Sequence, residues 1–200
     1  MARVTLVNRK GNAMFDVKKS AQVAGVLLSL SPDKSLDRIK LMKLMYLVDR
    51  QSFIQYGATV SGDRLVSLPH GPGLSETLSA LQGNLAYLAD FSRWVVIPQG
   101  SHEHSLLKGT ELENADLLSE ADIEVIENVW KEFGHMENWE LVDWTHDSRN
   151  CPEWQNPGRS SNTITLDGLS LALGIDSDES SKLQSQNIEV EGIRQSFAEL

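Results

Sequence analysis

The sequence predicts a mainly α-helical protein, a compact single helical domain that includes a small β-hairpin or short β-sheet. Long segments place apolar residues at helical spacing, several of these segments end at a glycine, and the strand-like segments are few and short. The chain has 200 residues, of which 40% are hydrophobic. This length is sufficient for one domain with a core of its own.

Two helices are expected near the start of the chain. Residues 15–30 place apolar side chains on one broad side of a helix, which Ser31-Pro32-Asp33 ends. Ser35 is the expected N-cap of a second helix over residues 36–56, which Gly57 ends. Apolar residues leave little room for a polar face on this second helix, so we expect it in the centre of the core.

A short strand is expected at residues 64–68, directly before the segment His70-Gly71-Pro72-Gly73. We predict a strand-to-helix corner here, because Gly71 permits a tight turn and Pro72 suits the first position of a helix. His70 is expected to form a hydrogen bond across this corner, and a partner-facing role is the alternative. A phosphate cradle is disfavoured, because Pro72 removes one of the backbone N–H groups that such a loop needs.

The middle of the chain predicts a leucine-rich helical segment and a second β element. Leucines between residues 74 and 88 follow helical spacing, with a break expected at Gly83-Asn84. Short strands are expected at residues 94–97 and 103–107, joined as a hairpin around Pro98-Gln99-Gly100.

The second half predicts further helices. Ser119 and Asp122 match a capping box at the start of a helix that Gly134 ends, with Ile123, Ile126, Trp130 and Phe133 on its buried side. Shorter helices are expected at residues 138–146 and 165–173, separated by a loop, and a last helix is expected after residue 178.

Charge is distributed unevenly along the chain. The net charge is −10; residues 1–60 carry ten Lys and Arg against four Asp and Glu, whereas residues 111–200 carry five against twenty. An acidic second half is unsuited to phosphate binding and suits a basic protein partner, although these acids could also serve only to solvate the surface. We therefore do not expect nucleic acid as a partner. The basic first 60 residues leave an autoregulatory DNA-binding protein as a third hypothesis.

The cellular location is predicted from what the sequence lacks. Cys151 is the single cysteine, which excludes an internal disulfide framework, and the first fifteen residues lack the apolar core of a signal peptide. No apolar run reaches the roughly 18 residues that span a bilayer. We therefore expect a cytoplasmic protein without a membrane partner.

Histidines offer a candidate metal site. On a strand, His102-Glu103-His104 would place two imidazoles on one face, and His135, His146 or Cys151 could supply a third ligand. The HExxH and CxxC patterns and the glycine-rich phosphate-binding motifs are absent. A metal-dependent hydrolase using His102, His104 or His146 is the alternative function. No catalytic residue, metal or cofactor is expected under the first hypothesis.

Several motifs together resemble a known family. Residues 40–46, KLMKLMY, are similar to the K-L-x-K-L-x-Y core-helix motif of the Panacea domain, also described as the SocA-like antitoxin domain. In that family the motif is followed by a strand and His-Gly-Pro, and later by a short helix that ends in Thr-His and by a tryptophan. The similarity runs from about Phe15 to Gly174. The matching positions, which are fold-defining in the family and candidates for partner binding, are Lys43, Tyr46, His70, Gly71, Pro72, Thr145, His146 and Trp154.

The resemblance implies the antitoxin half of a bacterial or phage toxin–antitoxin pair, and not an enzyme. Its partner would be a cognate protein toxin encoded by an adjacent gene, and some family members hand their toxin to a protease. The implied organisation is an N-terminal basic segment (1–14), a Panacea-like antitoxin domain (15–175) and a C-terminal helical tail (176–200). The acidic stretch 111–124 and the tail after residue 175 are less typical of the family. Either could be the toxin-specific surface.

Overall fold

The computed structural model describes residues 15–106, 110 and 112–176. The basic segment 1–14 and the helical tail 176–200 expected from the sequence therefore lie outside the described residues, apart from residue 176. Of the described residues 51% are helical and 12% are in strands, which confirms the mainly α class.

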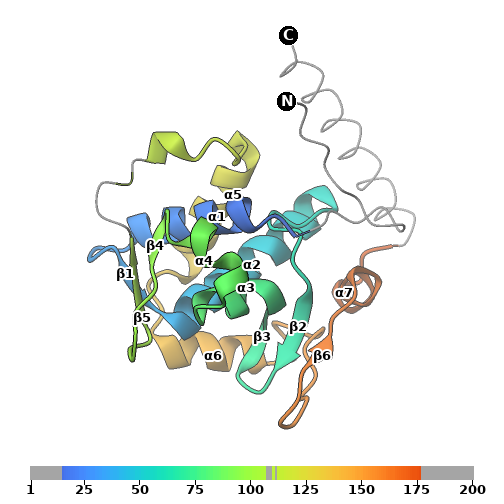
Figure 1. Cartoon of the computed structure of the whole chain (residues 1–200). Coiled ribbons are helices and arrows are strands. Elements are labelled where there is room, and N and C mark those ends of the chain that lie inside the picture. The colour runs from blue at the N-terminus through green and yellow to red at the C-terminus, as the bar shows by residue number, and fades with distance from the viewer. Residues whose placement is uncertain (1–14, 107–109, 111, 177–200) are drawn as a thin grey trace.

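The helix α2 (Arg38–Tyr56) runs through the middle of the molecule, as its apolar sequence predicts. Eleven of its nineteen residues are buried. The helix α1 (Val17–Leu30) lies on one side of α2 and α6 (Asn138–His146) lies on the other, while α5 (Glu120–Phe133) packs against both α1 and α2 (Figure 1). Gly57 ends α2 in a left-handed conformation (φ 71°), the conformation that glycine adopts without steric cost.

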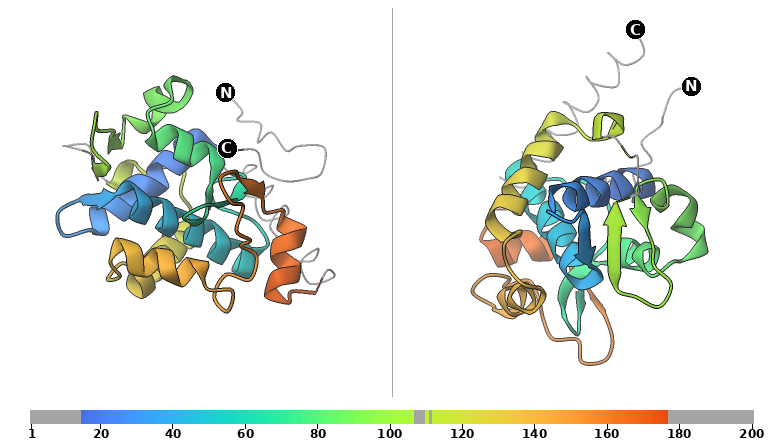
Figure 2. Two further views of the ribbon diagram at one scale, coloured as in Figure 1. Left: turned by 90° about the horizontal axis from the view of Figure 1, so that it is seen from below. Right: turned by 90° about the vertical axis from the view of Figure 1, so that its left-hand side faces the viewer.

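Two small antiparallel sheets lie on different sides of this helical core, and Figure 2 shows the first of them face-on in its right-hand view. Each has three strands. The first has the order β1 (Ser35–Asp37), β5 (Glu103–Leu106), β4 (Val95–Val96), and the second has the order β3 (Gly71–Leu74), β2 (Leu65–Leu68), β6 (Asn162–Thr163). The pairing of β4 with β5 confirms the expected hairpin.

The start of α2 differs from the prediction. Ser35 is not the N-cap, because residues 35–37 form a strand that pairs with β5, and Ser35 lies opposite Ser105. Asp37 takes the capping position, and its carboxylate accepts the backbone N–H of Ile39 at 2.7 Å. The pairing partner lies about seventy residues away, so local sequence could not reveal this strand.

The remaining helices follow the predicted order. The leucine-rich segment breaks at Gly83 (φ 85°) into α3 (Ser75–Leu81) and α4 (Leu85–Phe91). The capping box of α5 is present, but the buried side is Val125, Ile126, Val129 and Phe133, with Ile123 and Trp130 only partly buried. A short 3-10 helix (Leu112–Asn114) precedes α5, and α7 (Leu166–Leu173) ends at Gly174. No helix in the described part of the chain is long and apolar enough to cross a membrane.

Candidate functional site

The His-Gly-Pro segment forms a β-hairpin and not the predicted strand-to-helix corner. Leu68 pairs with Gly71, so Pro69 and His70 form the turn and β3 continues to Leu74. Pro72 lies on an edge strand, where a missing N–H is tolerated. The following helix begins only at Ser75, so the prediction that Pro72 occupies its first position was wrong.

Gly71 lies where the hairpin meets side chains of both α2 and α6. Its φ of 90° lies in the region that favours glycine. A Cβ at this position would lie 2.8 Å from Lys43 Nζ and 2.9 Å from Thr145 Oγ1. The backbone conformation therefore favours glycine, and a Cβ here would also force the Lys43 amine or the Thr145 hydroxyl to move.

Lys43 joins α2 to the hairpin. Its side chain is buried, with 3% of the residue exposed, and Nζ donates a hydrogen bond to the carbonyl oxygen of Pro72 at 2.5 Å. Burial disfavours the charged ammonium and lowers the pKa of Lys43 to about 7. The amine is therefore committed to a structural bond inside the protein.

Tyr46 lies one turn further along α2 and joins that helix to the loop after α6. Its hydroxyl donates to Glu153 Oε1 at 2.5 Å, and the Nε of Arg50 donates to the same oxygen at 2.7 Å. Arg50 Nη2 also donates to the carbonyl of Asn150 at 2.8 Å. The Glu153 side chain has no exposed area, so water does not solvate its charge. The ion pair with Arg50 balances that charge inside the protein.

The last two residues of α6, Thr145 and His146, also lie next to Gly71. Thr145 is fully buried, and its hydroxyl bonds to the carbonyls of Leu141 and Val142, both at 3.0 Å. The next residue, His146, places its ring 4.4 Å from the ring of Trp154, centroid to centroid.

Trp154 joins the loop after α6 to the hairpin, and one ring nitrogen of His146 has no hydrogen-bond partner among the described residues. The indole Nε1 of Trp154 donates to the carbonyl of Leu68 at 3.1 Å. In the described part of the chain the Nε2 of His146 is buried without a partner. Burial lowers the pKa of His146, the charge of Lys43 acts in the same direction, and a hydrogen bond with the Pro69 backbone opposes them.

His70 takes a different position from the other motif residues. It is exposed at the hairpin turn, and its ring contacts Trp139 of α6 edge-on, with 6.0 Å between centroids. The hydrogen bond predicted across the corner is not found among the described residues. Seven of the eight candidate residues therefore meet inside the junction of α2, α6 and the β2–β3 hairpin, while His70 lies at its outer edge.

Comparison with known protein families finds a match over the part of the chain that forms this junction. The sequence model of the family described as "Antitoxin SocA-like, Panacea domain" matches residues 41–155, more than half of the chain. The chain belongs to the SocA-like Panacea family. The matched residues run from the second residue of the α2 motif to the loop that holds Trp154, so they include all eight candidate positions. The curated proteins and the solved structures contain no match.

Two partners of the Panacea motif were not predicted from the sequence. Arg50 had a signal, because Lys43, Tyr46 and Arg50 follow one another at spacings of three and four residues and so share one face of α2. Glu153 had none, because its role depends on the path of a loop about a hundred residues away. Beside it, burial raises the pKa of the Cys151 thiol to about 12.

The histidines of the alternative hypothesis are not grouped around a possible metal. His104 is buried in β5, where its Nε2 faces the carbonyl of Leu81 at 2.8 Å and its Nδ1 faces that of His102 at 3.1 Å. Both ring nitrogens therefore lie against main-chain carbonyls. Among residues 15–106, 110 and 112–176, no group of three His, Cys, Asp or Glu side chains could hold a metal ion.

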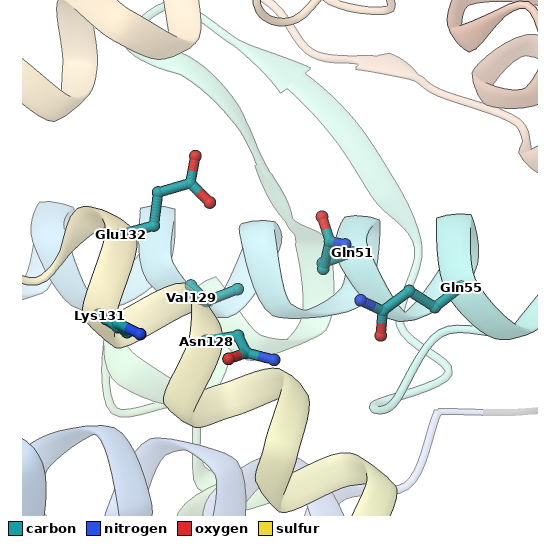
Figure 3. A pocket seen from close by; sticks show the side chains of 6 residues that line it. All are labelled: Gln51, Gln55, Asn128, Val129, Lys131 and Glu132. Carbon is teal, nitrogen blue, oxygen red and sulfur yellow. The ribbon is translucent and has the colours of Figure 1, made fainter.

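A shallow hollow of about 480 Å³ lies between α2 and α5, away from the Panacea motif. Figure 3 shows Gln55 extending from α2 toward Asn128 of α5. The residues that line the hollow are Gln51, Gln55, Asn128, Val129, Lys131 and Glu132. It contains amides and one pair of opposite charges but none of the eight motif residues. It offers no nucleophile paired with a base, as covalent catalysis would require.

Proposed function

We propose that this chain is the antitoxin of a type II toxin–antitoxin system and neutralises a protein toxin by binding it directly. The match to the SocA-like antitoxin family over residues 41–155 carries the proposal. The chemistry of the motif supports it, because the polar groups of Lys43 and Tyr46 are engaged in internal bonds. Such a motif builds a rigid scaffold, and binding surfaces on its outside perform the function.

The partner that we propose is a basic toxin encoded by an adjacent gene. The exposed side of α5 supports this choice, because Glu120, Glu124 and Glu127 all lie on it in contact with solvent. Opposite potentials steer two proteins together and raise the rate of association. We propose further that the complex forms in the cytoplasm.

The functional domain extends, in this proposal, over residues 15–175. The helix α1 precedes the matched residues, yet Ala24 and Leu27 are fully buried in the same core as α2. Leu169 of α7 follows the matched residues and is also fully buried in that core. Both helices therefore contribute to the stability of the scaffold.

Co-expression with the product of each adjacent open reading frame tests the function. We expect one product to stop growth when expressed alone, to be harmless with this chain, and to purify with it as a complex. The variant Leu44→Asp is the control: it places a charge at a fully buried position of α2 and should abolish rescue. The function is wrong if no adjacent product is both toxic and bound.

Neutralisation by binding and delivery to a protease give different results. If binding suffices, the purified chain inhibits the purified toxin without a protease present. If the chain acts as an adaptor, the toxin's half-life in cells shortens only when this chain and an ATP-dependent protease are both present. We expect inhibition in the purified system.

A further inference from the structure

The outward face of α6 carries a large aromatic side chain that the fold does not cover. Trp139 is 60% exposed, although tryptophan normally hides most of its surface. Its described ring contact is the edge-on one with His70 at the hairpin turn. Exposed tryptophans of this kind are the residues most enriched among those that dominate protein–protein binding energy.

Carboxylates lie beside this ring. Asp143 follows Trp139 by four residues and so lies on the same face of α6. Asp143 is exposed, and in the described part of the chain its charge raises the pKa of His146 while its carboxylate forms no hydrogen bond or ion pair. The nearby cation Lys40 interacts through its charge with Glu137 and Glu140, and its Nζ donates a hydrogen bond to the carbonyl oxygen of Gly134 at 2.9 Å. The Asp143 carboxylate therefore remains available to a partner.

We propose that the α6 face, formed by Trp139, Asp143 and His70, is the toxin-docking surface and receives an arginine side chain of the basic toxin. A guanidinium group is planar and weakly hydrated, so it can stack on an indole ring while its N–H groups donate to a carboxylate. Trp139 and Asp143 present these two features side by side. Because this inference rests on the proposed antitoxin function, its test begins with a toxin that binds the wild-type chain.

The test measures the affinity and association rate of surface variants for the adjacent-gene product that co-purifies with the full wild-type chain. We expect Trp139→Ala to weaken binding at least about tenfold, as for a central aromatic anchor. Trp139→Phe should retain most of the affinity. Asp143→Asn should slow association and reduce its salt dependence, and Asp143→Lys should have a larger effect than Asp143→Asn because it repels a cation.

Matched controls separate this surface from the rest of the molecule. Leu171→Ala removes another exposed large apolar side chain, one that is 83% exposed on α7, and Asp167→Asn removes the charge of an exposed carboxylate on the same helix. We expect both controls to bind within twofold of wild type. The thermal midpoints of Trp139→Ala and Asp143→Asn should lie within about 2 °C of wild type, since changes at exposed positions alter stability little.

The possible failures are distinguishable. If the wild-type chain binds no adjacent product, the antitoxin function and the docking surface are both wrong. If the wild-type chain binds its toxin but Trp139→Ala and Asp143→Lys bind within twofold of it, the function stands and the toxin docks elsewhere. Loss of binding in Leu171→Ala or Asp167→Asn, with the α6 variants unaffected, would also overturn the proposal and move the interface to α7.

Discussion

Replacing Gly71 by alanine tests the central claim about the junction of α2, α6 and the hairpin. Two costs add at this position. The positive φ of 90° strains any residue with a Cβ, by roughly 1–2 kcal/mol. The new methyl group would also lie 2.8 Å from Lys43 Nζ and displace its bond to Pro72. Leaving a buried hydrogen-bonding group without its partner costs roughly 1–3 kcal/mol. We therefore expect Gly71→Ala to lower the free energy of unfolding by about 2–5 kcal/mol.

Gly100→Ala is the matched control, because Gly100 also has a positive φ (78°) but has no atom within 4 Å of the position that a Cβ would take. This variant should show the strain alone, about 1–2 kcal/mol. Urea unfolding followed by far-UV circular dichroism measures both. The reasoning is refuted if Gly71→Ala destabilises the protein no more than Gly100→Ala does. In a Lys43→Met background, the difference between the two variants should become smaller.

Three other changes have defined outcomes in the same unfolding assay. Tyr46→Phe leaves Glu153 without one buried donor and should cost about 1–3 kcal/mol; an unchanged stability would mean that the bond contributes nothing. Asp49 is fully buried, and burial raises its pKa to about 7, so the folded state binds a proton more tightly than the unfolded state. Stability of the wild type relative to Asp49→Asn should therefore fall as pH rises from about 4 to 7, by up to about 1.4 kcal/mol per pH unit, and a flat or rising difference would contradict the assignment. Ser119→Ala removes the acceptor for the Asp122 N–H in the capping box of α5 and should cost about 1 kcal/mol, which equal melting temperatures would exclude.

Local sequence predicts the helices of this protein well, because their signals lie within the helices themselves. The apolar run of α2 indicated its central place, and the Ser119–Asp122 capping box marked the first turn of α5. The segment Gly71-Pro72-Gly73 was misassigned because these residue types favour turns and helix starts. Its strand conformation depends on pairing with β2 and on the bond from Lys43, and both are long-range contacts.

The candidate site was predicted through a family resemblance and not through reactive chemistry. Seven of its eight residues do meet in one place, but the resemblance did not indicate which of them face solvent. His70 was expected to brace a corner, yet it lies outside next to Trp139, whose exposure the sequence did not reveal. Helix α2 carries several charged and polar residues, and its sequence pattern gave no reason to expect that Lys43 and Asp49 among them are buried with their own partners.

Cys151 gives the protein a natural chemical reporter of its own opening. It is the single cysteine of the chain, its side chain is fully buried, and its pKa is raised to about 12, so almost no thiolate is present at neutral pH. Alkylating reagents react with the thiolate, and because this sulfur is buried they can reach it only when the structure around Cys151 opens. The rate of labelling therefore measures how often the junction opens. The same measurement, repeated with a bound partner, would report how far binding holds it closed.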